Sequence, residues 1–157
     1  MPADLQVRRF TDASRAGELL ALAHGAFGEL AIDPPSSVLK ETAADFAARL
    51  TSETCLVIEN DGRIIASVFC IRQDDALYIG RLAVAPEWRR RGIASALVNA
   101  AQAEARRIGA KRMTLKARIA LARNVELFRR HGFVIVAEET HAGFPAPTSY
   151  AMELALI

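Results

Sequence analysis

The spacing of apolar and polar residues along the chain predicts alternating strands and helices. Apolar residues at every second position indicate a strand, and apolar residues three or four positions apart indicate a helix. Strands are expected at residues 5–10, 54–60, 63–71, 76–85, 111–117, 133–137 and 149–156. Helices are expected at residues 13–27, 37–50, 92–108 and 121–131. The order β-α-α-β-β-β-α-β-α-β-β predicts an α/β (α+β) fold, with a mixed sheet and four helices on its faces.

Turn and cap residues support these boundaries. Asp61-Gly62 between two β-rich runs is a strong hairpin signal. Asp12 is a suitable N-cap for the first helix, and Asp33-Pro34-Pro35 interrupts the chain before a second helix that starts near Ser37. Glycines at 109 and 132 are typical of helix C-termini.

The strand at residues 76–85 changes its apolar phase. Leu77 and Ile79 share one parity, whereas Leu82 and Val84 share the other, with Gly80-Arg81 between them. A β-bulge at Gly80-Arg81 explains the change, because side chains alternate with a period of two and a bulge inserts one residue. A strand buried on both faces is the alternative explanation.

Charge is distributed unevenly over the 157 residues, whose net charge is +2. Residues 1–80 contain 7 Lys/Arg and 12 Asp/Glu, whereas residues 81–157 contain 13 Lys/Arg and 6 Asp/Glu. The basic half suits an anionic ligand, and the acidic half, including Glu29 and Asp33, suits a cationic one. Solvated helix faces would explain the same clusters without a ligand.

Length and composition predict one cytoplasmic domain covering residues 1–157. The chain is 52% hydrophobic and 24% charged, which excludes a disordered protein. No apolar run reaches the ~18 residues of a membrane span, and the first residues do not resemble a signal peptide. The two cysteines, Cys55 and Cys70, are too few for a disulfide framework and lack the spacing of metal ligands.

A basic segment between the fourth strand and the third helix is a candidate phosphate site. The first N–H groups of a helix have no intrahelical partners and lie at the positive end of its dipole. Gly92 would let the backbone approach a phosphate closely, and Ala94 leaves room beside it. The candidate anion-binding residues are Arg89, Arg90, Arg91, Gly92, Ile93, Ala94 and Ser95. Neither G-x-x-x-x-G-K-[ST] nor G-x-G-x-x-G is present.

This segment resembles the [Q/R]-x-x-G-x-[G/A] signature of the GNAT superfamily of acyl-CoA N-acyltransferases. The preceding Leu82-Ala83-Val84-Ala85-Pro86 and the later Leu127-Phe128 followed by Gly132-Phe133 are similar to the same family. The order of elements also matches from the first strand to the last. The resemblance implies a mostly antiparallel sheet in which the bulged strand splays from its neighbour.

The resemblance also implies acetyl-CoA as the cofactor. Backbone groups of Leu82 and Val84, in the triplet with Ala83, would pair with the pantetheine arm, and amides from Arg89 to Ser95 would hold the pyrophosphate. On the fourth helix, Phe128 occupies one of the family's cofactor-contacting positions. Asn124 lies one helical turn after another of these positions.

Catalytic positions depart from the family pattern. The position of the family's carboxylate base holds Tyr78, which could at most order a water molecule or pass a proton, and an ordinary strand aromatic is the alternative. The tyrosine that protonates the leaving thiolate in the family is replaced by Phe128, which cannot donate a proton. His141, in the loop between the last two strands, is a second candidate for proton transfer.

The sequence is therefore interpreted as an N-acetyltransferase that moves an acetyl group directly to a primary amine in a ternary complex. A non-catalytic acyl-CoA-binding module is the alternative, since Phe128 could signal lost chemistry. A nucleic-acid binder is disfavoured, because no aromatic residues alternate with the arginines. The amine acceptor is not specified, no membrane partner is expected, and a homodimer through the last strand would be ordinary for the family.

Overall fold

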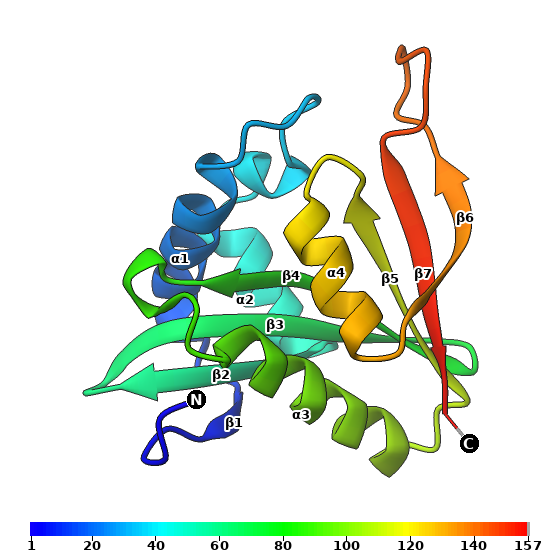
Figure 1. Ribbon diagram of the computed structural model, residues 1–157. Coiled ribbons are helices and arrows are strands. Elements are labelled where there is room, and N and C mark those ends of the chain that lie inside the picture. The colour runs from blue at the N-terminus through cyan, green and yellow to red at the C-terminus, as the bar shows by residue number, and fades with distance from the viewer. Residues whose placement is uncertain (157) are drawn as a thin grey trace.

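One continuous seven-stranded sheet forms the centre of the computed structural model, which describes residues 1–156 (Figure 1). The strands are β1 (Val7–Phe10), β2 (Thr54–Asn60), β3 (Arg63–Gln73), β4 (Ala76–Val84), β5 (Arg112–Arg118), β6 (Val134–Glu139) and β7 (Ser149–Ala155). Their order across the sheet is β1-β2-β3-β4-β5-β7-β6. Only β4 and β5 pair in parallel, so the mixed, mostly antiparallel sheet is confirmed.

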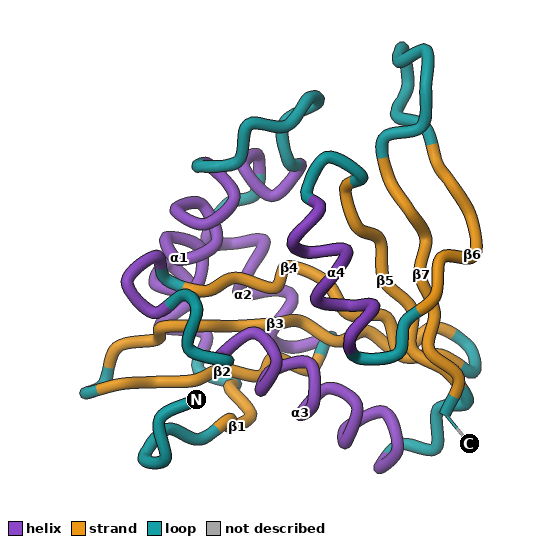
Figure 2. The backbone as a smooth tube through the Cα atoms, in the orientation of Figure 1, coloured by secondary structure: helices purple, strands orange, loops and turns teal. Residues whose placement is uncertain are grey.

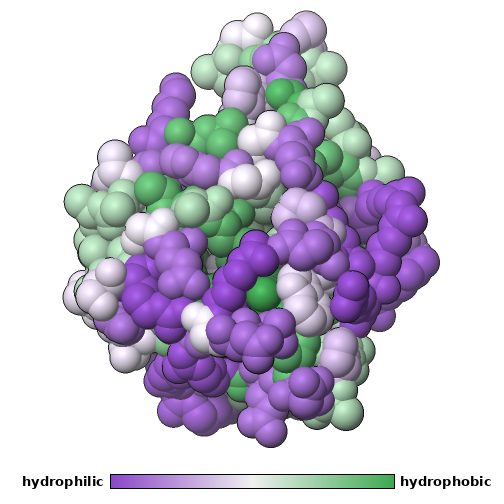
Figure 3. Space-filling model, turned by 90° about the vertical axis from the view of Figure 1, so that its left-hand side faces the viewer, coloured by the Kyte–Doolittle hydropathy of each residue, from purple (hydrophilic) through white to green (hydrophobic). Residues whose placement is uncertain are grey.

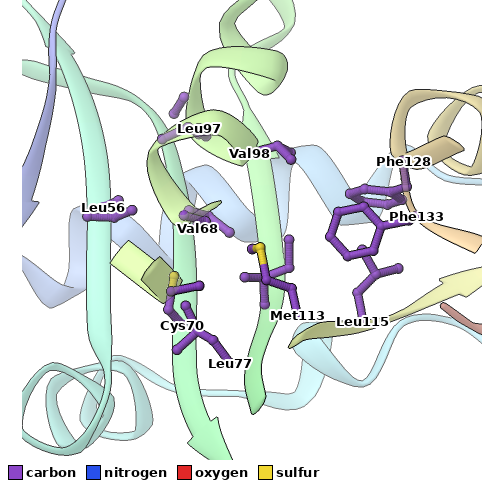
Figure 4. Close-up of a cluster of buried hydrophobic side chains, with 14 of the residues drawn as sticks. Leu56, Val68, Cys70, Leu77, Leu97, Val98, Met113, Leu115, Phe128 and Phe133 are labelled. Atoms are coloured by element: carbon purple, nitrogen blue, oxygen red, sulfur yellow. The ribbon is translucent and has the colours of Figure 1, made fainter. Parts of the chain in front are cut away.

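Helices cover both faces of the sheet (Figure 2). They are α1 (Ala16–Gly28), α2 (Ala43–Ser52), α3 (Ile93–Arg107) and α4 (Ala122–Arg130). In the view of Figure 1, α3 and α4 lie in front of the sheet, and α1 and α2 lie behind it. Each pair covers its own apolar core. Figure 4 shows the α3–α4 side, where Leu97 and Val98 lie over the strands and Phe128, Phe133 and Leu115 lie together.

The expected turns and helix ends are confirmed. Asp61 and Gly62 both have positive φ, 50° and 78°, and close the β2–β3 hairpin. These angles match the two-residue turn whose twist suits paired strands. Gly109 and Gly132 follow α3 and α4 with φ of 75° and 94°, as expected for residues that end helices.

The predicted start of the second helix is wrong, whereas Asp12 is an N-cap as expected, on a short turn that precedes α1. The second helix does not run unbroken from residue 37, because Ser37–Lys40 is a separate 3-10 turn and α2 begins at Ala43. Thr42 caps α2: its hydroxyl accepts from the amide of Asp45, whose carboxylate accepts from the amide of Thr42. Asp12 likewise caps a 3-10 turn, Ala13–Arg15, that leads into α1.

The bulge in β4 is confirmed. Ser67 lies opposite Ala83 and Phe69 lies opposite Gly80, so β4 has two residues where β3 has one. Arg81 at this point has a φ of 56°, in the left-handed region. As a result, Leu82 packs against the same α3–α4 core as Ile79, although their parities differ.

The sheet opens just before the bulge, from Ile79 of β4 onward. The strands β4 and β5 pair only through Ala76, Leu77 and Tyr78 of β4. From that point β5 continues to Arg118 paired only with β7. In Figure 1 the strands β2 to β4 cross the view, whereas β5, β7 and β6 rise steeply. The strand pair next to the candidate phosphate loop is therefore splayed, as the resemblance implied.

Polar and apolar side chains share the face of the molecule drawn in Figure 3. Figure 3 shows hydrophilic side chains over the lower part and one edge of the face in view, with apolar patches between them. Across residues 1–156, every helix is too short or too polar to span a bilayer.

Candidate acyl-donor and acceptor site

A cavity of about 690 Å³ occupies the opening between β4 and β5. One end is bordered by Arg89 and Ala94 at the start of α3 and by Asn124 and Phe128 on α4. The other end is bordered by the C-terminal part of α1, including Phe27. The cavity therefore reaches from the α3–α4 face of the sheet to the side covered by α1.

The open edge of β4 offers backbone groups to a ligand in this cavity. The amide of Ala85 donates to the carbonyl of Ile65 on β3 at 2.8 Å. Successive residues of a strand point their polar groups to opposite edges. The backbone groups of Leu82 and Val84 thus face away from β3, toward the gap, and both residues line the cavity. Ala83 is buried and faces Ser67 of β3.

The loop before α3 has the geometry of an anion site. Gly92 is the N-cap of α3 and has a φ of 75°, and Arg90 has a φ of 62°. No side chain caps this helix within residues 1–156, so the amides that follow Gly92 stay available to a ligand. The guanidinium of Arg91 lies over the Trp88 ring, 4.7 Å from its centroid. The three arginines remain exposed around a helix start without an acidic cap.

The first turn of α3 is tied to the end of α4. The imidazole Nε2 of His131 lies 3.0 Å from the hydroxyl oxygen of Ser95. Burial lowers the pKa of His131, because the charged ring loses hydration without gaining a carboxylate. This contact joins the start of α3 to the end of α4, two helices that both contribute residues to the lining of the cavity.

Phe128 lies where the resemblance places the family's proton donor. Its ring is buried, lines the cavity and packs edge-on against Phe133 with centroids 6.0 Å apart. A phenyl ring contributes apolar surface here and no proton. Asn124, one turn earlier on α4, is exposed and also lines the cavity.

Tyr78 lies on the opposite face of the sheet from the α3–α4 core. Its ring leans on Gly80: a Cβ at Gly80 would lie 3.1 Å from the Tyr78 ring. Tyr78 lines a second hollow of about 390 Å³ that shares Leu115 and Lys116 with the main cavity. Tyr78 itself is not part of the lining of the main cavity, but Gly80, against which its ring leans, is part of it.

His141 is not brought to this cavity. Its Nδ1 and its backbone amide both contact the hydroxyl oxygen of Thr148, and its ring packs edge-on against Phe144. These contacts lie within the loop that joins β6 and β7, which projects beyond the rest of the sheet in Figure 1. The surroundings of His141 are those of a residue that shapes its own loop.

Two acidic residues of the N-terminal half, Glu29 and Glu41, are paired with arginines. Glu29 pairs with Arg89 at 2.8 Å. Glu41 binds both Arg81, at 2.7 Å, and Arg49, at 2.6 Å. Burial by itself would raise the pKa of Glu41, but the two guanidinium groups outweigh it and hold the pKa below its ordinary value. Glu29 is therefore already paired with a guanidinium, and the expectation that the acidic half faces a cationic acceptor stays a prediction.

Sequence reasoning missed the cations that line the cavity outside the phosphate loop. Arg81, Lys116, Arg118 and Arg123 all border it, and no carboxylate does so within the described chain. Side chains alternate between the two faces of a strand, so the sequence of residues 111–118 could have shown that Lys116 and Arg118 share one face.

Comparisons with solved structures agree with this architecture. An acetyltransferase of the GNAT family from Streptococcus pneumoniae superposes with a TM-score of 0.78 at 19% identity, covering 98% of this chain and 99% of that one. The PaiA N-acetyltransferase from Thermoplasma acidophilum, in complex with coenzyme A, has a TM-score of 0.82 at 13% identity, with 98% and 99% covered. YncA from Salmonella typhimurium, a putative acetyltransferase solved with acetyl-CoA, has a TM-score of 0.75 at 20% identity, with 99% and 95% covered. No curated protein sequence matches this chain.

A sheet that opens between β4 and β5, with a helix N-terminus at the opening, is the α/β fold that this chain shares with these acetyltransferase structures. The family follows from the sequence itself. The acetyltransferase (GNAT) family model matches residues 18–133, well over half of the chain, so the protein belongs to the GNAT acetyltransferase family.

Proposed function

We propose that the protein transfers an acetyl group from acetyl-CoA to a primary amine, directly and within a ternary complex. The observation that carries this proposal is the cavity through the splayed sheet, which connects the start of α3 with the side of the sheet covered by α1. A donor at one end and an acceptor at the other would meet beside the bulge of β4. Positioning two reactants in this way lowers the barrier without a covalent enzyme intermediate.

Three features of the cavity fit acetyl-CoA. The outward backbone groups of Leu82 and Val84 match an amide-containing arm, and the uncapped start of α3 matches a pyrophosphate. Arg89, Arg90 and Arg91 supply positive charge beside that helix start. PaiA and YncA, which share the fold, were solved with coenzyme A and acetyl-CoA. When bound, acetyl-CoA supplies an activated acetyl thioester.

The chain's own groups would act by position and by hydrogen bonding. An amine must be unprotonated to attack, and a lysine-like amine has a pKa near ~10.4. The Tyr78 hydroxyl, held beside Gly80, would order a water molecule that accepts this proton. Outward amides at the β4 bulge would stabilise negative charge that develops on the carbonyl oxygen. Phe128 supplies no proton, so the thiolate would leave by virtue of its own thiol pKa of about 8.5.

A non-catalytic acyl-CoA-binding module is the second candidate, and Phe128 at the proton-donor position is the observation that favours it. The two candidates differ in turnover and not in cofactor binding.

A thermal-shift screen followed by an amine panel separates these candidates. The protein is heated with CoA, acetyl-CoA, ATP or NAD, and CoA thiol release is then measured with a panel of primary amines. A ligand at ~100 times its dissociation constant adds roughly 2.7 kcal/mol to the free energy of unfolding. Stabilisation by CoA species alone, with turnover of at least one amine, supports the transferase. Stabilisation without turnover supports the binding module, and equal stabilisation by ATP or NAD contradicts both.

A further inference from the structure

The side chain of Arg118 enters the acceptor end of the cavity. Leu115 and Ala117 of β5 belong to the α3–α4 core. Side chains alternate along a strand, so Lys116 and Arg118 point to the opposite face, where α1 lies. The contacts of Arg118 agree with this direction, since its Nη2 donates to the carbonyl oxygens of Pro34 and Pro35 in the segment after α1.

Arg118 forms no salt bridge within residues 1–156, although the carboxylate of Asp33 acts on its charge from a longer distance. Three other cations that line the cavity each form a salt bridge. Arg81 pairs with Glu41, Lys116 pairs with Glu139, and Arg89 pairs with Glu29.

Arg123 also forms no salt bridge in the described chain, but it lies on α4, beside the donor end. Among the cations that line the cavity in residues 1–156, Arg118 is the one that combines partial burial, the lack of a salt bridge and a place at the acceptor end.

The guanidinium of Arg118 also has unused donors. Only Nη2 is engaged, by two neutral carbonyl oxygens, while Nε and Nη1 have no acceptor in the described chain. Neither nitrogen is among the buried unpaired atoms, so both remain accessible. Partial burial lowers the pKa of Arg118, yet an arginine stays charged at neutral pH. A carboxylate is the group that a guanidinium binds best, through two parallel hydrogen bonds.

We infer that the amine acceptor carries a carboxylate, which Arg118 binds, so that the acceptor is an amino acid or a similar amino-carboxylic acid. This inference rests on the proposed acetyltransferase function. In this arrangement the ammonium end loses its proton near Tyr78 while the carboxylate is held on β5 by Arg118. The absence of carboxylates from the lining of the described cavity agrees with an acceptor that is not a polycation.

Matched substrates test this inference. Each of several L-amino acids is compared with its own amide and with the amine that lacks the carboxyl group, and kcat/KM is measured with acetyl-CoA as the donor. We expect the free acids to exceed their amides by about 10- to 100-fold, the range for a charge-assisted contact. Arg118→Gln should bring this ratio toward one, mainly through KM, and Arg118→Lys should restore part of it. Arg72→Gln, an exposed arginine on β3 away from the cavity, should leave the ratio unchanged.

The outcomes distinguish a ligand contact from a structural role. If Arg118 only fastens the Pro34-Pro35 segment, then Arg118→Gln lowers kcat/KM for acids and amides alike, and the inference is overturned. Wild-type protein that prefers amides or simple amines also overturns it, while leaving the acetyltransferase proposal intact. Turnover of no amine, with CoA still bound, overturns the acetyltransferase proposal and the inference together.

Discussion

Gly92 provides a direct test of the anion site at the start of α3. The residue has a φ of 75°, and a Cβ added there would lie 3.1 Å from the backbone nitrogen of Met1. Both Asp and Asn would bring the same backbone strain, roughly 1–2 kcal/mol for a residue in the left-handed region, and both tolerate that region better than most residues. The pair Gly92→Asp and Gly92→Asn therefore differs almost only in charge.

The expected loss of CoA affinity is large for Asp and smaller for Asn. At an effective dielectric of about 20, two unit charges about 6 Å apart repel each other by about 2.8 kcal/mol. That energy corresponds to roughly 100-fold in dissociation constant, since ~1.4 kcal/mol is tenfold. We therefore expect Gly92→Asp to bind CoA about 100-fold more weakly than Gly92→Asn. The Asn variant itself should lie between Asp and wild type, because its side chain obstructs the loop without adding charge.

Calorimetric titration with CoA measures the three dissociation constants, and circular dichroism confirms that each variant is folded. Arg89→Ala should cost less than Gly92→Asp, and its loss should shrink as salt is raised, because Arg89 is exposed. A folded Gly92→Asp protein that binds CoA as tightly as Gly92→Asn would refute the assignment of this loop to phosphate binding.

Three further predictions follow from buried groups. Phe128→Tyr should raise kcat modestly with little change in CoA affinity; a fall in both would show that the Phe128 ring packs against the cofactor arm with no room for a hydroxyl. Burial raises the pKa of Cys55 and of Cys70 to about 12, so neither thiol should react with a disulfide reagent at pH 8 until the protein unfolds, and fast reaction in the native state would contradict their burial. His131 has a lowered pKa, so the unfolded chain binds more protons than the folded one below about pH 6.5. The free energy of unfolding should fall between pH 7 and pH 5.5, and less so in His131→Asn; an equal fall in both proteins would exclude His131 as the cause.

The sequence predicted those features that local rules control. The hairpin at Asp61-Gly62 and the helix ends at Gly109 and Gly132 each follow from residues that adopt positive φ easily. The bulge was visible as a change of apolar parity around Arg81, because both halves of the strand must face one core.

Features that depend on distant partners were not predictable. The pairing of Glu29 with Arg89 joins residues 60 positions apart, and the carbonyl contacts of Arg118 span 84 and 83 positions. Periodicity alone cannot show such contacts, so the acidic half appeared free to bind an acceptor. The start of α2 at Ala43 depends on a local signal, the Thr42–Asp45 capping box, which the helical spacing of apolar residues does not show.

The central claim is direct acetyl transfer through the cavity between β4 and β5. Initial rates measured over a matrix of acetyl-CoA and acceptor concentrations, with the acetylated amine quantified by mass spectrometry, test it most directly. The account predicts one acetylated amine for each CoA released, intersecting double-reciprocal lines, and no acetylated enzyme when acetyl-CoA is added alone. Parallel lines with an acetylated enzyme, or CoA release without any acetylated amine, would contradict it.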